Sequence, residues 1–166
     1  MFRLSCALFF LALVTTFGIK PVGACNGTAP AWRTMSESLV ILRSDEGVTH
    51  QLAVKIAVKP AQRRAGFQHI CSEWVQVWGV LFVFPTSQRS MFHMRNVRDD
   101  LDIAFIAEDG RILELKKMSW EEDSGGGHRY RAAQPFRYAL EVAAGRLSML
   151  GLDEGSWWLV LDPAWN

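Results

Sequence analysis

The sequence is poor in the features that define several large classes of protein. Its 166 residues contain only three cysteines, too few for a fold built on disulfides. Eighteen basic and 17 acidic residues almost cancel, so no charge excess points to a nucleic-acid or anionic-membrane partner. No apolar run reaches the roughly 20 residues of a comfortable transmembrane helix. With 49% hydrophobic and 21% charged residues, the composition is that of a single globular domain.

Common catalytic and cofactor motifs are also missing from the sequence. No glycine-rich phosphate loop follows a strand pattern, and no Gly-x-Ser-x-Gly elbow is present. The cysteines and histidines do not have the spacing of a zinc site, and Glu121-Glu122-Asp123 lacks the alternating ligands of a calcium loop. The sequence therefore predicts no cofactor and no metal.

The first 24 residues have the order of a secretory signal. Met1-Phe2-Arg3 is a short basic start, and an apolar run of about 14 residues follows from Leu4 to Phe17. Val22-Gly23-Ala24 then offers small residues where a signal peptidase cuts. We expect a signal peptide over 1–24, export to the periplasm or the extracellular space, and no membrane span after cleavage.

Cys25 raises the question of a lipid anchor. Residues 22–25 resemble a bacterial lipoprotein box, but Lys20 and Pro21 separate that box from the apolar run. Lipid attachment at Cys25 and simple cleavage therefore remain two alternatives. After cleavage, Cys25 and Cys71 are the only thiols, and they can pair in an oxidising compartment. A buried Cys71 that acts as a small apolar side chain is the favoured alternative.

The mature chain divides into a leader with a first short strand, 25–48, and a single β-rich domain, 49–166. Residues 26–38 are polar and lack an apolar period, which indicates a linker or a loose N-terminus. Apolar and polar residues alternate over 51–58, which predicts a strand with one buried face. Pro60 is suited to the first turn of a short helix that runs to Ala65 and ends near Gly66.

Further short strands are expected along the rest of the chain. Residues 78–84 are apolar throughout, as in a strand buried on both faces, and Asp109-Gly110 is typical of a tight hairpin turn. Residues 136–142 fit a strand or a helix, 143–150 fit a helix, and 121–127 fit a flexible loop. The remaining predicted strands are 39–42, 89–96, 101–107, 112–118 and 156–161. The pattern predicts a mainly β (α+β) fold: a compact antiparallel barrel or sandwich of short strands with one or two short helices.

Four ordered blocks of this chain resemble a known family. The blocks are Arg63-Arg64-Ala65-Gly66-Phe67, the apolar run 79–84, residues 92–97 with 101–106 and Asp109-Gly110, and Tyr138-Ala139-Leu140-Glu141-Val142 with Ala144-Gly145 and 153–155. They are similar to the domain-of-unknown-function 192 family of small, often exported prokaryotic proteins of uncharacterised function. The resemblance implies a compact, mostly β domain and brings no mechanism. Where the family usually has tryptophan, lysine and threonine, this chain has His93, Arg95 and Val97.

The strongest candidate for a binding site is the polar group Arg95, Asn96 and Asp102. It flanks the short connection 97–100 between two predicted strands, where a scaffold presents side chains to solvent. A cation, an amide and a carboxylate together suit a small anionic or sugar-like ligand. Alternatively, Asn96 caps the turn and Asp102 pairs with an arginine that fixes the strand register.

Two further residues are candidates for the same role. His93 is able to act as a general base or a ligand, but it stands where the family has an aromatic residue, which favours a packing role. Arg63, beside Arg64, is able to bind an anion near the end of a helix, or else it lies on a solvated helix face.

Two functions fit these observations. The first is a non-catalytic envelope module that binds a small molecule or an envelope protein, since no nucleophile–base pair is evident. The alternative is an envelope hydrolase that uses Asp102 with His93 or Asn96 as acid and base. The second function requires these side chains to converge on one cleft.

Overall fold

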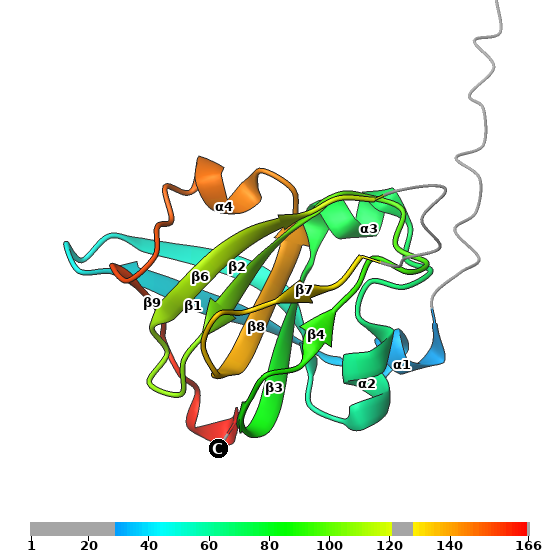
Figure 1. Ribbon diagram of the computed structural model, residues 1–166, viewed down its shortest axis with the longest axis horizontal. Coiled ribbons are helices and arrows are strands. Elements are labelled where there is room, and N and C mark those ends of the chain that lie inside the picture. Colours follow the sequence, from blue (N-terminus) through cyan, green and yellow to red (C-terminus); the bar gives the residue numbers. More distant parts are fainter. Residues whose placement is uncertain (1–28, 121–127, 166) are drawn as a thin grey trace, which may run out of the picture.

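The computed structural model describes residues 29–120 and 128–165 (Figure 1). Strands dominate, and the helices are short. The elements are α1 (Pro30–Arg33), β1 (Ser36–Ser44), β2 (Thr49–Ala57), α2 (Pro60–Ala65), α3 (Ser72–Val77), β3 (Gly79–Gln88), β4 (Met91–Phe92), β5 (Leu101–Ile106), β6 (Ile112–Met118), β7 (Tyr130–Arg131), β8 (Phe136–Ala143), α4 (Arg146–Met149), β9 (Trp157–Leu159) and the 3-10 turn η1 (Pro163–Trp165).

Seven strands form one sheet in the order β6-β5-β8-β3-β2-β1-β9. The sheet curls into a nearly closed barrel, because the Leu159 amide of β9 donates to the Gly110 carbonyl before β6 at 2.8 Å. The mainly β barrel predicted from the sequence is confirmed. One pair, β2 with β3, is parallel. The crossover that contains α2 and α3 allows this, since parallel neighbours need a long connection.

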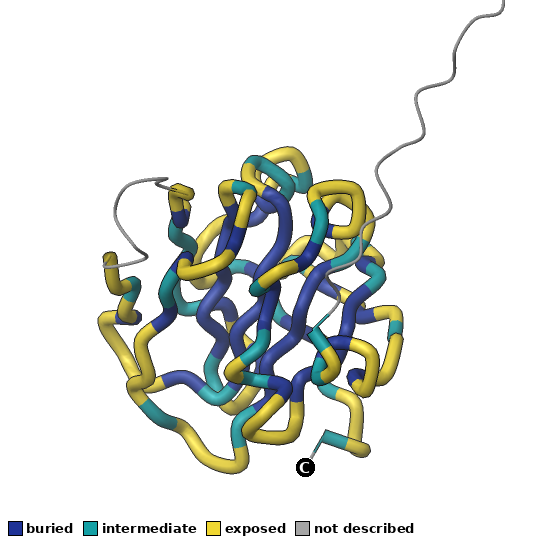
Figure 2. The backbone as a smooth tube through the Cα atoms, turned by 90° about the vertical axis from the view of Figure 1, so that its right-hand side faces the viewer, coloured by how far each residue is buried: buried dark blue, intermediate teal, exposed yellow. Residues whose placement is uncertain are grey.

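The barrel interior holds one of two hydrophobic clusters. Strand residues that point inward alternate with residues that point outward, as the period of two in 51–58 predicts. Leu52, Val54 and Ile56 of β2 therefore face the interior. Side chains from every strand of the sheet and Leu147 of α4 complete this cluster. In Figure 2 the buried backbone runs through the centre of the molecule, and the exposed segments lie outside it.

The second hydrophobic cluster lies on the outer face of the sheet. It joins residues of β3, β5 and β8 to residues of α1, α3, β4 and the segments that follow α2 and β4. Strand β3 contributes to both clusters, which explains why its sequence is apolar without alternation. The fold therefore has a layer of helices and short strands packed on one outer side of a barrel.

Two sequence-based predictions about local structure are wrong. Residues 26–38 do not form a linker in their described part, because α1 covers the outer cluster and Trp32 is only 1% exposed. Residues 89–96 do not form one strand, because only Met91 and Phe92 pair, with β7. Asn96 ends that segment with φ at 59°, a left-handed conformation that asparagine tolerates.

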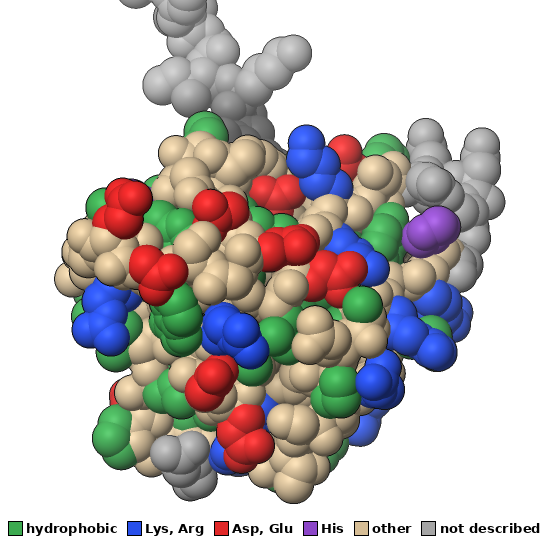
Figure 3. Space-filling view, turned by 60° about the vertical axis from the view of Figure 1, so that its left-hand side comes forward, with side chains coloured by type: hydrophobic (Ala, Val, Ile, Leu, Met, Phe, Trp, Pro, Cys, Tyr) green, Lys and Arg blue, Asp and Glu red, His purple; other side chains and the backbone are tan. Residues whose placement is uncertain are grey.

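Four further observations concern Cys71, the predictions that fall outside the described residues, membrane-spanning helices and surface charge. Cys71 is half-buried and disulfide-bonded, rather than a buried free thiol, and its partner lies outside the described residues. The predicted signal peptide, the lipid site at Cys25 and the loop 121–127 also lie outside them. Within the described residues no helix is long and apolar enough to cross a membrane. Acidic and basic side chains both occur on the face shown in Figure 3.

Candidate functional site: a cavity around Glu141

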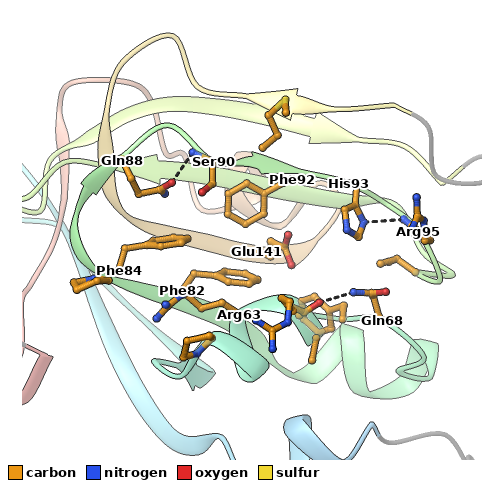
Figure 4. Close-up of a pocket in the computed structure, with 18 of the residues that line it drawn as sticks. Arg63, Gln68, Phe82, Phe84, Gln88, Ser90, Phe92, His93, Arg95 and Glu141 are labelled. Carbon is orange, nitrogen blue, oxygen red and sulfur yellow. Dashed lines mark hydrogen bonds between the residues drawn. The ribbon is translucent and has the colours of Figure 1, made fainter.

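A cavity of about 700 Å³ lies on the outer face of the barrel, between α2 and the β3–β4 segment (Figure 4). Its apolar walls come from rings and small side chains of these elements, and its polar groups are mostly cations and amides. The lining residues are Pro60, Arg63, Arg64, Ala65, Gly66, Phe67, Gln68, Phe82, Phe84, Pro85, Thr86, Gln88, Ser90, Met91, Phe92, His93, Arg95, Val97 and Glu141. This volume is within the range of small-molecule sites.

Glu141 is the buried polar residue of this cavity. It lies on β8 between Ala139 and Ala143, which both belong to the outer cluster, so it shares their face of the strand. The side chain is 5% exposed, and no hydrogen bond or ion pair joins its carboxyl to another described residue. Burial raises the pKa of the Glu141 carboxyl to about 8. Much of the Glu141 population is therefore neutral at pH 7.

Two phenylalanines and a glycine surround this carboxyl. Figure 4 shows Glu141 between Phe82 and Phe92, whose rings make an edge-to-face contact with centroids 5.1 Å apart. A Cβ atom at Gly66 would lie 3.2 Å from the Phe82 ring and 3.6 Å from Oε2 of Glu141. Gly66 ends α2 with φ at 45°, so it supplies both the turn and the close approach of the backbone.

Arg63 holds α2 against the sheet at the edge of the cavity. Its Nη1 donates to the carbonyl oxygen of Val58 and, at 3.0 Å, to that of Val83 on β3. Its guanidinium also lies 5.1 Å from the centroid of the Phe84 ring. Burial, and then the neighbouring Arg64, lower the pKa of Arg63, which remains charged. Arg63 therefore has a structural role besides lining the cavity.

His93 and Arg95 follow β4 and lie at one end of the cavity (Figure 4). The Arg95 amide donates to Nδ1 of His93 at 3.3 Å, which leaves Nε2 as the N–H donor of a neutral imidazole. The pKa of His93 is lowered by burial, and further by the charges of Arg129 and Arg95. The ring is therefore neutral at pH 7 and offers a donor.

Gln88 lies at the opposite end of the cavity, close to Phe84 (Figure 4). Its Oε1 accepts a hydrogen bond from the Ser90 amide, and this bond fixes which side of the side-chain amide carries the nitrogen. The Nε2 atom of Gln88 is buried and has no partner among the described residues. A buried donor without a partner costs free energy unless another molecule accepts from it.

Residues 40–157 match the model of DUF192, an uncharacterized ACR family. The chain belongs to the domain-of-unknown-function 192 family. A solved structure from Sinorhizobium meliloti, described as a "putative transcription regulator", is similar with a TM-score of 0.66 and 29% identity, over 75% of this chain and 95% of that one. A protein of unknown function from Novosphingobium aromaticivorans has a TM-score of 0.62 and 22% identity, over 79% and 98%. No curated protein matches.

The five site residues predicted from the sequence fall into three groups in this DUF192 domain. Arg63, His93 and Arg95 line the cavity. Asn96 lies beside it, where its Nδ2 is 3.3 Å from Oε1 of Gln68, a cavity residue. The Asn96 carbonyl accepts from the His69 amide, so Asn96 also stabilises the turn. Asp102 is the residue that the structure separates from the others.

Asp102 and His93 do not share a cleft. Asp102 is buried on β5, and its Oδ2 accepts a hydrogen bond from the Leu147 amide at 3.2 Å, next to the barrel interior. His93 lies in the cavity on the outer face, with Phe82 and Phe92. The acid–base pair of the hydrolase hypothesis requires one cleft, and this geometry does not provide it. The predicted ion pair of Asp102 with an arginine is absent among the described residues.

Sequence reasoning missed the two unpartnered groups of the cavity, Glu141 and Gln88. The sequence contains a signal for the first. Residues 136–143 form one apolar strand interrupted by Arg137 and Glu141. A carboxylate in a strand that is buried on both faces costs free energy unless it has a partner, so its presence there indicates a functional group. Gln88 has no such signal, because its burial depends on the loop to β4. No group of three or more His, Cys, Asp or Glu in the described ranges is placed to hold a metal ion.

Proposed function

We propose that this DUF192 domain is a non-catalytic module that binds a small molecule in the cavity around Glu141. The observation that carries the proposal is the carboxyl of Glu141, buried in an open cavity without a partner of its own. Burying a polar group without hydrogen bonds is unfavourable, and the cost remains until a partner arrives. A bound ligand supplies that partner for Glu141.

The shape of the cavity supports binding of a small molecule. Its walls combine aromatic and aliphatic side chains with polar and charged groups, and ligand pockets likewise join apolar walls to polar groups that fix orientation. The edge-to-face packing of Phe82 against Phe92 and the anchoring of Arg63 hold the walls in place without a ligand. A preformed site loses little conformational entropy on binding.

We further propose that the module works in the cell envelope. The order of basic start, apolar run and small residues over 1–24 supports export, and the two alternatives for Cys25 are cleavage with or without a lipid anchor. A ligand-binding domain in that compartment meets small envelope metabolites and fragments of envelope polymers.

The test is native mass spectrometry of the protein purified from its own cell envelope, with the intact mass recorded. Thr86→Trp places a bulky ring at the cavity, and Ser87→Trp is its matched control. Both residues are exposed on β3, but only Thr86 lines the cavity. We expect a stoichiometric extra mass on the native protein and on Ser87→Trp, and its loss in Thr86→Trp.

Two other results count against the proposal. A bare mass for the native protein contradicts tight binding of a small molecule. An extra mass that persists in Thr86→Trp places the ligand elsewhere. The same spectrum gives the first residue of the mature chain and shows whether Cys25 carries lipid, which tests the envelope part separately.

A further inference from the structure

The charged side chains along the cavity are mostly cations, and its neutral polar side chains include both donors and acceptors. Arg63, Arg64 and Arg95 carry positive charge, and His93 keeps an N–H on Nε2 because Nδ1 accepts from the Arg95 amide. Gln88 directs its oxygen to Ser90 and leaves Nε2 free of any partner among the described residues. Glu141 is the only carboxyl among the lining residues.

The apolar groups lie between the two polar ends. Figure 4 shows Gln88 and Phe84 toward one end, His93 and Arg95 toward the other, and Phe82, Phe92 and Glu141 between them. The cavity is thus an apolar passage with a cation toward each end: the Arg63 guanidinium lies on Phe84 near the Gln88 end, and Arg95 lies beside His93 at the other end. Asn96 links these two segments by its contact with Gln68.

We propose that the ligand of this cavity is an organic anion with an apolar body, whose charged group lies at the His93–Arg95 end and whose body passes Glu141 between Phe82 and Phe92. This inference rests on the proposed function, because it names the class of molecule that the same cavity takes. Donors and cations suit the acceptor oxygens of a carboxylate, and the phenylalanine walls suit carbon chains or rings. A cationic ligand would instead face three arginines.

Glu141 then acts as a neutral residue when the anion binds. The charged and titratable groups around the cavity, besides Glu141, are Arg63 and Arg64 from α2, His93 and Arg95 from the segment after β4, and Arg129 just before β7, whose charge acts on His93. Between pH 7 and pH 9 the arginines stay charged and His93 stays neutral, so Glu141 is the group of this set that titrates. Its ionisation places a negative charge beside the ligand, so anion binding weakens as the pH rises.

The experiment is an NMR titration of the protein, expressed from the full chain, with sodium octanoate, 1-octanol and octylammonium. At pH 7 we expect octanoate to bind at least tenfold tighter than the other two probes, with shifts centred on Gly66 and β4. Arg95→Gln should weaken octanoate binding about tenfold, the usual effect of losing a charged hydrogen bond. Arg98→Gln, an exposed arginine outside the cavity, is the control and should bind as the native protein does.

The pH series separates the role of Glu141 from a general loss of binding. With a pKa of about 8, the neutral share of Glu141 falls from about nine-tenths at pH 7 to one-tenth at pH 9, so octanoate affinity should fall about tenfold. Glu141→Gln stays neutral, so it should keep the affinity measured at pH 7 and lose this pH dependence.

Three results would overturn the inference. If octylammonium binds best, the ligand is a cation paired with ionised Glu141. If 1-octanol binds as tightly as octanoate, the charge has no role. In both cases the cavity remains a binding site, and the proposed function stands. If none of the three probes shifts the cavity signals at millimolar concentration, the inference fails, and the mass spectrum alone decides the proposed function.

Discussion

At the scale of single residues, Glu141 couples the stability of the fold to pH. Burial raises its pKa to about 8, above the ordinary value of 4.5 that the unfolded chain is expected to have. Between these values the folded protein holds a proton that the unfolded protein has lost. Raising the pH therefore favours unfolding: the stability is fully present below pH 4.5 and is lost as the pH rises through 8.

Glu141→Gln removes this dependence. We expect the free energy of unfolding of the native protein to fall, relative to the variant, by on the order of 1 kcal/mol per pH unit between pH 5 and pH 8. Urea denaturation of both proteins at pH 5, 6, 7 and 8 measures the difference. Asp102→Asn is the control, because it removes an equally buried carboxyl from the opposite face and leaves Glu141 in place. Parallel curves for the native protein and Glu141→Gln would contradict the argument.

At the scale of elements, α2 carries one side of the cavity, and a buried glutamine fixes its position. Oε1 of Gln62 accepts from the amides of Val58 and Lys59, at 3.1 and 2.8 Å, which caps the start of the helix. Its Nε2 donates to the Thr34 carbonyl at 2.9 Å, just after α1. This one side chain joins α2 to the segment after β2 and to the segment after α1.

We expect Gln62→Met to destabilise the fold by roughly 2–3 kcal/mol, because it removes three hydrogen bonds from a buried side chain to the backbone, each contributing about 1 kcal/mol net, while it keeps the volume of the side chain. Gln76→Met is the matched control: Gln76 is exposed on α3, and its change should cost less than about 0.5 kcal/mol. Urea denaturation followed by tryptophan fluorescence gives both values. Equal costs for the two variants would show that the Gln62 hydrogen bonds contribute nothing net.

The elements also show what a sequence can and cannot predict. Helix α2 was predictable at both ends, since Pro60 and Gly66 act through their own backbone. Helix α1 was not, because four residues in a polar segment become helical only through the packing of Trp32 on the outer cluster. The same holds for the candidate site. Arg63, His93 and Arg95 were identified by residue type, whereas the burial of Glu141 and Gln88 depends on elements distant in sequence.

At the scale of the whole molecule, the barrel closes where the turn between β5 and β6 meets β9. Gly110 accepts from the Leu159 amide there, and its φ of 90° is one that glycine adopts easily. A Cβ atom at Gly110 would lie 2.3 Å from the Leu159 carbonyl oxygen, so any side chain pushes β9 away. Gly47, in the turn between β1 and β2, has a similar φ of 84° but nothing within 4 Å of its Cβ position.

This pair of glycines isolates the contribution of closure. Gly47→Ala should cost about 1–2 kcal/mol from backbone strain alone. Gly110→Ala should cost the same plus roughly 1–3 kcal/mol, because β9 must move and the Leu159 hydrogen bond weakens. Urea denaturation measures both, and hydrogen exchange of the Leu159 amide should accelerate only in Gly110→Ala. If the two variants lose equal stability and Leu159 stays protected, β9 accommodates the added methyl group with the closing hydrogen bond intact, and the expected displacement of β9 is wrong.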